Sequence, residues 1–298
     1  MPPAIRSRPQ PHLPDTRSEL WLPRLSLMGC IRGVMLRDTR GVELRPEQCF
    51  SYYPATPLCS ISWYLEGEVD MLLPGHAATQ QAPRTCMAAR TVFSGPQTTP
   101  LVTCTHGQGY GLMLLLLPDA FQCLTGLNPG QWRNRTIAAK DILPPSWLIM
   151  AEQVRSAADD SIRMKVIEDF FDPLWQTHRS DQTLGIQHYT DWVQGLAIRA
   201  ATTRIGRSLR QIERRILQWA GQPIRELRGF ARAERAFFDL MARDETRPVD
   251  WSGLALDHDF SDQSHLCRIS RRMTGFAPKA LYERIARDEG FWPYRIWQ

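Results

Sequence analysis

The sequence has no apolar run long enough to cross a lipid bilayer. Its longest run, GLMLLLLP at 111–118, covers eight residues, whereas a membrane-spanning helix needs roughly 20. The N-terminus carries arginines but lacks the apolar core of a secretory signal. We therefore expect no membrane partner and a cytoplasmic protein.

The sequence also lacks the patterns of metal sites and of common catalytic sites. Its seven cysteines are an odd number without a C-x-x-C pair, which argues against a disulfide framework and against a zinc ribbon. His76 and His106 do not belong to the clustered ligand set of a metal site. G-x-S-x-G, H-E-x-x-H and a phosphate-binding glycine loop are absent. No catalytic residue, metal or cofactor is predicted, and an enzyme is not expected.

What the sequence does have is an uneven distribution of positive charge. The net charge is +5, and residues 186–298 contain 19 basic against 14 acidic residues, so the rest of the chain is neutral. Of those 19 basic residues, 18 are arginine, the side chain best suited to phosphate groups and to guanine edges. The C-terminal third is therefore expected to meet an anionic partner.

A change of pattern divides the chain into two predicted domains of an α+β protein. Residues 1–23 are rich in proline and are predicted to be a disordered tail. Short apolar runs separated by turn residues dominate the first part of 24–180 and predict an antiparallel β-barrel or sandwich, followed by amphipathic helices. Residues 181–185 are the predicted linker, and 186–298 has a helical pattern throughout.

An internal repeat lies in the helical domain. SLRQIERRILQWAGQP at 208–223 aligns with DQSHLCRISRRMTGFA at 262–277 at an offset of 54 residues. The first residue of each copy suits a helix N-cap, and Gly221 and Gly275 suit helix ends. Each copy follows a short helix and a tight turn. Each therefore predicts a helix-turn-helix unit, whose second helix enters the major groove of DNA.

Each predicted recognition helix has an apolar and a polar face at 100° per residue. The residues predicted to face inward are Leu209, Ile212 and Ile216 in the first helix and Leu266, Ile269 and Met273 in the second. Those predicted to face outward are Arg207, Arg210 and Arg214 in the first helix and Ser264, Arg268 and Arg271 in the second. Arginines on one exposed face repel each other, so an anionic partner is expected there.

The segment 223–243 between the copies predicts one long helix. About 20 residues of helix span roughly 30 Å, close to one turn of B-DNA, which is about 34 Å. Such a connector could place both recognition helices in successive major grooves without dimerisation. The predicted partner is therefore double-stranded DNA, bound across two adjacent major grooves.

These segments resemble the DNA-binding domain of AraC/XylS-type transcriptional regulators. Their second unit typically reads G-F-x-D-Q-S-H-x-x-R-x-F-x-x-x-x-G-x-x-P, and eight positions match: Phe260, Asp262, Gln263, Ser264, His265, Arg268, Gly275 and Pro278. The resemblance implies two helix-turn-helix units joined by a long helix. It also implies DNA-reading roles, which by position fall on Arg210, Glu213, Arg214, Gln263, Ser264, His265 and Arg268.

Two residues depart from the family pattern. Asp259 stands where the family usually has glycine in the turn. Because aspartate tolerates the left-handed backbone conformation better than most residues, we expect the turn to survive. Ser270 stands where the family usually has a buried phenylalanine. The lost apolar side chain is expected to loosen the core of the second unit and to make it the weaker reader.

The N-terminal region resembles, less specifically, the cupin-like sensing domain attached to many of these regulators. The resemblance rests on FSGPQTTPL at 93–101 and on the segment 111–143, and it implies a small-molecule effector. The residues predicted to line the effector pocket are Trp63, Tyr64, Phe93 and Tyr110. The alternative for these aromatic residues is packing in the core.

The predicted function is an effector-responsive regulator of transcription. Its further candidate partners are RNA polymerase and a second copy of the chain, and the sequence is compatible with an activator and with a repressor. Two alternatives remain open. One is a barrel enzyme with a basic targeting domain, and the other is a helical protein-interaction module whose arginines face an acidic protein.

Overall fold

The computed structural model describes the chain except for residues 1–3, 7–11, 179–187, 203–207, 244–247 and 298. The protein is an α+β molecule: two antiparallel sheets come first along the chain, and the later part is helical. The predicted linker, 181–185, lies outside the described residues.

The larger sheet has seven strands in the order β1–β2–β3–β10–β5–β8–β11. Their bounds in this order are Ala4–Arg6, Arg17–Trp21, Ile31–Asp38, Tyr110–Leu116, Cys59–Glu66, Thr91–Ser94 and Thr136–Ala138. The smaller sheet has the order β4–β9–β6–β7, with bounds Phe50–Tyr53, Leu101–Thr105, Val69–Leu72 and Arg84–Cys86. Strand β10 is apolar along most of its length and pairs on both sides, so that Leu114 lies between Val34 and Ile61.

The strands do not close into the predicted β-barrel. The described strands form two separate sheets, which matches the sandwich alternative. An isolated bridge between Thr56 and Gln97 lies outside the named strands. Strand-length runs and turn residues predict that strands exist, but closure depends on which strand edges meet, and a local pattern does not specify that.

The prediction that residues 1–23 form a disordered tail is wrong for much of the part of this segment that the structure describes. Strand β2 pairs with β3, and both Leu20 and Trp21 are buried. Glu19 is also buried, and Arg17 donates to it over 2.8 Å. The prediction relied on the proline content of the segment, whereas the run SELW forms a strand paired between β1 and β3, with apolar side chains for the core.

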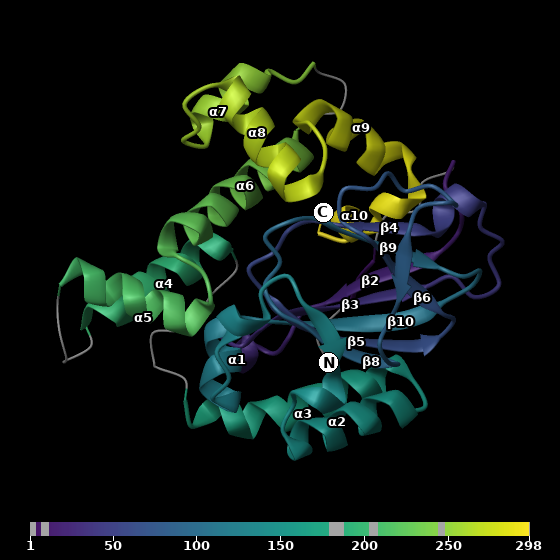
Figure 1. The fold of residues 1–298 in the computed structure, drawn as a ribbon, viewed down its shortest axis with the longest axis horizontal. Coiled ribbons are helices and arrows are strands. Elements are labelled where there is room, and N and C mark those ends of the chain that lie inside the picture. Colours follow the sequence, from purple (N-terminus) through teal and green to yellow (C-terminus); the bar gives the residue numbers. More distant parts are fainter. Residues whose placement is uncertain (1–3, 7–11, 179–187, 203–207, 244–247, 298) are drawn as a thin grey trace.

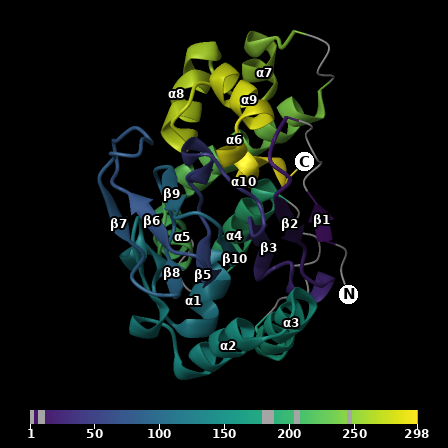
Figure 2. The ribbon, with the colours of Figure 1, turned by 90° about the vertical axis from the view of Figure 1, so that its right-hand side faces the viewer.

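Three helices complete the N-terminal part: α1 (Pro118–Thr125), α2 (Pro145–Ser156) and α3 (Asp160–Gln176). Helices α2 and α3 lie beneath the larger sheet, with the last helices of the chain, drawn in yellow, on the opposite side (Figures 1 and 2). Trp147 of α2 packs edge-on against Phe171 of α3, with ring centroids 5.0 Å apart. The Trp63 side chain of β5 donates to the carbonyl of Ala151 over 2.9 Å, which fixes α2 to the sheet.

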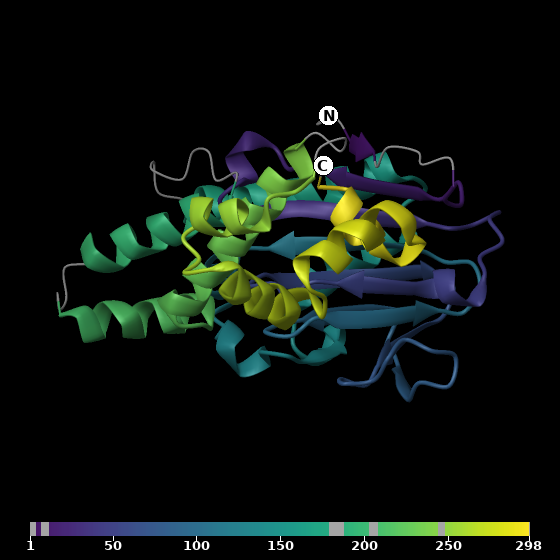
Figure 3. The same cartoon turned by 90° about the horizontal axis from the view of Figure 1, so that it is seen from above.

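The C-terminal part consists of seven described α-helices. They are α4 (Tyr189–Thr202), α5 (Leu209–Ala220), α6 (Ile224–Ala242), α7 (Trp251–Asp257), α8 (Gln263–Thr274), α9 (Pro278–Arg287) and α10 (Trp292–Arg295). Short 3-10 helices add η1 (Leu25–Leu27), η2 (Pro46–Cys49), η3 (Pro129–Trp132), η4 (Ala139–Asp141) and η5 (Glu289–Phe291). The predicted connector at 223–243 is α6. Figure 3 shows α4 and α5 projecting beyond one end of the sheets. The yellow C-terminal helices lie over the sheets.

The two parts of the molecule share one hydrophobic core. Buried residues of α4 and α5, among them Trp192 and Ile216, belong to the same cluster as the larger sheet. At the other end, Glu289 of η5 pairs with Arg37 of β3 and, over 3.0 Å, with Arg295 of α10. The helical part is therefore docked on the sheets by both apolar and ionic contacts.

Candidate nucleic-acid interface

Each copy of the internal repeat contains one helix, and the two helices begin and end at equivalent positions of the two copies. Helix α8 begins and ends 54 residues after α5, as the sequence offset predicts. Ser208 caps α5 together with Gln211, and Asp262 caps α8 by accepting from the amide of His265 over 2.7 Å. Gly221 and Gly275 end the two helices in the left-handed conformation, with φ of 71° and 85°.

The turn of the second unit, α7–α8, survives the replacement of glycine by aspartate. Asp259 has a φ of 59°, the left-handed conformation expected for this position. Two arginines of α6 hold it: Arg232 donates to its carbonyl over 2.9 Å and Arg235 to its carboxylate over 3.1 Å. The amide of Phe260 donates to Ala255 over 2.9 Å, which closes the turn. The predicted tolerance of Asp259 is confirmed.

In the first recognition helix, α5, the side chains of Arg210, Glu213 and Arg214 are exposed. Arg207, the third residue predicted to face outward in this unit beside Arg210 and Arg214, lies outside the described residues. Leu209 was predicted to face inward, but it is 81% exposed. Helix α5 buries its apolar face only from its second turn onward, and helical angle alone does not show where the surface beneath a helix ends.

In the second recognition helix, α8, Gln263, Ser264, Arg268 and Arg271 are exposed, whereas Leu266 and Met273 are buried. The predicted polar and apolar faces are therefore those of the structure. The hydroxyl of Ser252 donates to the Gln263 side chain over 3.3 Å.

His265 differs from the other residues predicted to read DNA, because it is only half exposed. Its Nδ1 lies 3.3 Å from the amide of Ser261, and its ring stands edge-on to Phe260 with centroids 5.4 Å apart. These contacts fix the start of α8. The structure therefore gives His265 a positioning role, and a base contact from it stays a prediction.

Arginines of the two regions have different partners. In the N-terminal domain they mostly face carboxylates, as in the pairs Arg17–Glu19, Arg24–Glu168, Arg37–Glu289, Arg40–Asp38 and Arg163–Asp160. On α5, α6 and α8, seven exposed arginine side chains make no hydrogen bond or ion pair with any described residue. They are Arg210, Arg214, Arg225, Arg228, Arg268, Arg271 and Arg272. Arginines without an ion-pair partner among the described residues are thus concentrated on and between the recognition helices.

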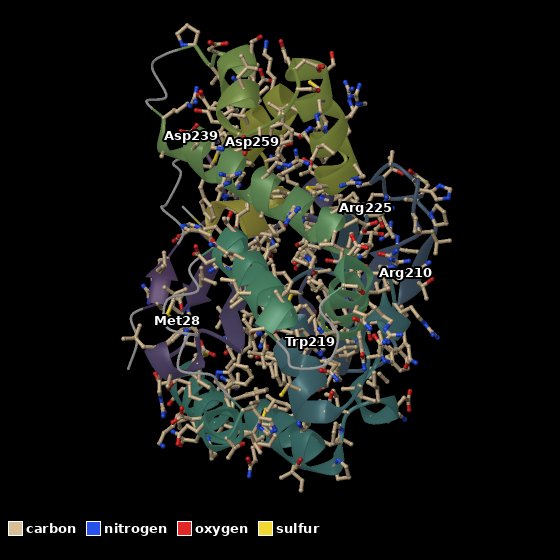
Figure 4. All side chains as sticks on the ribbon, turned by 90° about the vertical axis from the view of Figure 1, so that its left-hand side faces the viewer. Met28, Arg210, Trp219, Arg225, Asp239 and Asp259 are labelled. Atoms are coloured by element: carbon tan, nitrogen blue, oxygen red, sulfur yellow. The ribbon has the colours of Figure 1, made fainter. Side chains whose placement is uncertain are left out.

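Both recognition helices lie on one side of α6. This side faces the viewer in Figure 1 and forms the left edge of the helical part in Figure 2. Figure 4 shows the labelled Arg210 of α5 and Arg225 of α6 near the same edge of the molecule, opposite Met28. Helix α6 has 19 residues, which corresponds to about 28 Å of axis.

Sequence reasoning missed the arginines of α6, because it considered only the core face of the connector. A spacing signal was present: Arg225, Arg228, Arg232 and Arg235 recur at three- and four-residue steps. This spacing places arginines on one side of a helix.

A cavity of about 90 Å³ lies between the two sheets. Its lining includes Trp63, Tyr64 and Tyr110, three of the four residues predicted for an effector pocket. Burial, together with the hydrogen bond to Asp160, raises the pKa of Tyr110. The fourth predicted residue, Phe93, does not line it, because its fully buried ring stacks on Phe121 with centroids 4.8 Å apart. That part of the pocket prediction is wrong, and the core alternative holds for Phe93.

A larger cavity, of about 240 Å³, lies between the N-terminal domain and the helices α6, α8 and α9. Most of its lining is apolar, with Met113 and Leu115 on one side and Phe237 and Met273 on the other. Sequence reasoning missed this cavity, because its walls come from segments far apart in the chain.

Ser270 of α8 borders the larger cavity. Its hydroxyl donates to the carbonyl of Phe276 over 2.7 Å, which ties the end of α8 to the turn before α9. A small side chain here leaves space that a phenylalanine would occupy. The predicted loosening at Ser270 thus coincides with a cavity wall.

The lining of the larger cavity includes one basic and one acidic side chain, which form an ion pair. Arg32 of β3 lies 3.1 Å from Glu234 of α6, and both side chains are 9% exposed. The carboxylate of Glu234 also accepts from the amide of Tyr189 over 2.5 Å. Burial raises the pKa of Glu234 despite the opposing effect of Arg32. The pair links the two domains across the cavity.

Within the described ranges, no three histidine, cysteine, aspartate or glutamate side chains come together as a set of metal ligands. No helix in the described part of the chain combines the length and the apolar character needed to cross a membrane.

Comparison with known proteins gives matches to solved structures alone: no family model matches, and neither does any curated protein. The chain is similar to apo ToxT K231A from Vibrio cholerae strain SCE256, at 12% identity and a TM-score of 0.37 over 83% of this chain and 96% of that one. It is similar to unsaturated fatty acid bound ToxT from the same strain, at 12% identity and a TM-score of 0.37 over 83% and 94%. It is also similar to the AraC-like transcriptional activator CuxR, at 10% identity and a TM-score of 0.28 over 94% and 86%.

Proposed function

We propose that this chain is a sequence-specific DNA-binding regulator of transcription, of the AraC/XylS type that its sequence resembles. The observation that carries the proposal is the pair of matched recognition helices, α5 and α8, each capped alike and each with exposed arginines that lack a partner in the described structure. Both lie on one side of α6, whose length suits two successive major grooves.

The exposed side chains have the chemistry of base readers. Arg214 and Arg268 can each donate two hydrogen bonds to guanine, and Gln263 can pair with adenine. Glu213 can accept from cytosine, while Ser264 suits either kind of base. Arg210 and Arg271 supply further positive charge beside them. The two units therefore read two half-sites about one helical turn apart.

The test is selection of bound duplexes from a random-sequence pool by the full chain, followed by footprinting. Two protected half-sites, 10 to 10.5 base pairs apart from centre to centre, are expected. Arg214→Ala and Arg268→Ala should each weaken specific binding by about 1–3 kcal/mol and relax base preference at one position. If a polyanion competes as well as the selected duplex does, the arginines serve a different, acidic partner and the proposal fails.

The larger cavity is the best-supported place for an effector of this regulator. Its apolar walls favour an apolar small molecule, and its volume suits a compact one. Because Arg32 and Glu234 already neutralise each other, the lining offers no free counter-charge, and an uncharged ligand fits better than an acid. Such a ligand would bind against the inner face of α8 and so act on the second unit.

Ser270→Phe should fill this cavity and abolish the response of DNA binding to the effector. Ser270→Ala is the matched control, because it removes the hydroxyl bond to Phe276 without filling space. The readout is binding to the selected duplex during a screen of uncharged apolar compounds and fatty acids. If Ser270→Phe responds like the native chain, the effector lies elsewhere, and the smaller cavity between the sheets is the next place to test.

A further inference from the structure

The first half of α6 carries positive charge that nothing in the described chain neutralises. Arg225 and Arg228 are exposed and make no hydrogen bond or ion pair with any described residue. Arg232 and Arg235 continue the same row, but both hold the turn at Asp259. Of these four arginines, Arg232 and Arg235 therefore stabilise the fold, whereas Arg225 and Arg228 are available to bind a partner.

A third guanidinium joins Arg225 and Arg228 from the second unit. Arg272 of α8 is exposed, and its Nη2 lies 3.6 Å from the position that a Cβ would take on Gly229 of α6. Met273, next in the chain, packs at the same glycine at 3.9 Å. Arg272 therefore lies against α6 at Gly229, next in the chain to Arg228 and four residues from Arg225, which brings positive charge from two helices together.

The carboxylates of α6 do not compensate this group. Glu234 pairs with Arg32 across the cavity, and Asp239 binds Arg243 and His258. Glu226 makes no described ion pair with Arg225 or Arg228. Guanidinium groups that lie close together without an acidic partner repel each other. The three arginines are therefore suited to binding an external anion.

We propose that Arg225, Arg228 and Arg272 bind the phosphodiester backbone of DNA between the two major grooves; the proposal rests on the DNA-binding function. A protein that spans two successive major grooves must cross the sugar-phosphate backbones between them. Helix α6 joins the recognition helices, and its Arg225 lies near the edge that Arg210 also occupies (Figure 4). Guanidinium groups bind phosphate oxygens well, and such contacts set register without reading sequence.

This assignment predicts a contact that is electrostatic and independent of sequence. Each phosphate neutralised contributes about 0.9 to the slope of log affinity against log salt concentration. The double variant Arg225→Ala with Arg228→Ala should therefore lower that slope by about 1.8. The change should be the same for the selected duplex and for a scrambled duplex of equal length, and the ratio of their affinities should stay constant.

Two matched variants sharpen the test. Arg225→Lys with Arg228→Lys should keep most of the slope, because lysine also binds phosphate as a point charge. Arg155→Ala with Lys165→Ala removes the same two charges from exposed positions on α2 and α3, and Figure 1 shows these helices at the end of the molecule opposite α8. This control should leave the slope unchanged.

The outcomes separate this inference from the proposed function. If the alanine pair on α6 leaves the slope unchanged while Arg214→Ala still relaxes base preference, the phosphate contact is overturned and the regulator stands. A slope change equal to that of the α2 and α3 control would mean a general charge effect and would also overturn it. If the native chain binds selected and scrambled duplexes equally well, the sequence-specific function fails, and the slope still tests the phosphate contact. Binding to no duplex overturns both.

Discussion

The two helix-turn-helix units share one plan but have different support. The first unit is built into the core of the sheets: Ile216 and Ala220 of α5 belong to the large N-terminal cluster. Trp192 of α4 donates to Asp119 of α1 over 2.8 Å. The second unit has a small core of its own, in which Leu254 and Phe260 pack on α6.

The difference shows which unit an effector could move. The second unit borders the larger cavity. There the N-terminal domain contacts it through Ala55, which packs on Met273 and donates from its amide to the Met273 carbonyl over 2.7 Å. Residues of α8 form part of the wall of this cavity, whereas Ile216 and Ala220 of α5 belong to the core of the sheets, so a ligand in the cavity would contact α8 and not α5. The repeat in the sequence specifies two matched helix-turn-helix units, and their contacts with the N-terminal domain make them unequal.

The largest effect is expected from loss of the ionic anchor on the side of the second unit. Glu289 is buried and binds both Arg37 of the sheet and Arg295 of α10. Glu289→Gln leaves two largely buried guanidinium groups without their counter-charge, which should lower the free energy of unfolding by about 3–5 kcal/mol. Urea unfolding measures this change.

Glu152→Gln is the control for the anchor, because Glu152 forms an exposed pair with Arg155 on α2. It should leave the unfolding curve unchanged. Equal curves for the two variants would show that the C-terminal segment gains nothing from its ionic contact with β3.

A smaller effect is expected at the attachment of the first unit. Gly221 and Gly126 have nearly the same φ, 71° and 73°, but a Cβ on Gly221 would lie 2.5 Å from the backbone nitrogen of Gly130. Gly126→Ala should cost about 1–2 kcal/mol for the left-handed conformation alone. Gly221→Ala should cost roughly 3 kcal/mol, because α5 must also move away from η3.

Gly275→Ala completes this series. Gly275 ends α8 with a φ of 85°, and a Cβ at this position would contact only Pro100, at an ordinary van der Waals distance of 3.8 Å. It should behave like Gly126→Ala in thermal unfolding. A cost at Gly221 no greater than at the other two positions would refute the tighter attachment of the first unit.

The smallest effect is expected from acid. Hydrogen bonds from Arg243 and then His258 hold the pKa of Asp239 below its usual 3.8, against a small opposing effect of burial. A lowered carboxylate pKa stabilises the folded state above the usual value, and that stability is lost as pH falls through the lowered one. Asp239 connects α6 to the segment around α7, so the second unit should loosen below about pH 3.8.

Hydrogen exchange of α7 amides, relative to those of α4, measures the acid effect. The native chain should show faster relative exchange in α7 below the usual pKa, and Asp239→Asn should show that faster exchange at every pH. A native profile that is flat in this range would remove Asp239 from the support of the second unit.

The local features of the helical domain could be predicted from the sequence. Caps, end glycines and the 54-residue repeat placed α5 and α8, and helical angles identified the exposed faces of Arg214 and Arg268. These features depend on residues within a few positions of each other. The left-handed backbone of Asp259 could also be predicted locally, but its two hydrogen bonds from arginines of α6 could not.

Features that depend on distant segments could not be predicted. The exposure of Leu209, the core position of Phe93 and the strand β2 in the supposed tail all depend on which surface lies opposite. The larger cavity is the clearest case, since Ser270 predicted a looser core but not the sheet residues that face it. The amino-acid composition gives the number of arginines, but it does not show which of them form ion pairs with acidic residues.

Helix α6 also makes the protein intolerant of length changes at one place. One residue inserted in a helix advances the next unit by 1.5 Å and rotates it by 100°. An insertion in α6 would therefore turn the reading face of α8 away from that of α5, even if every contact within each unit survived. Strands and loops of the first domain can vary in length during evolution, but this connector has to keep its number of residues as long as both half-sites are read on one face of the duplex.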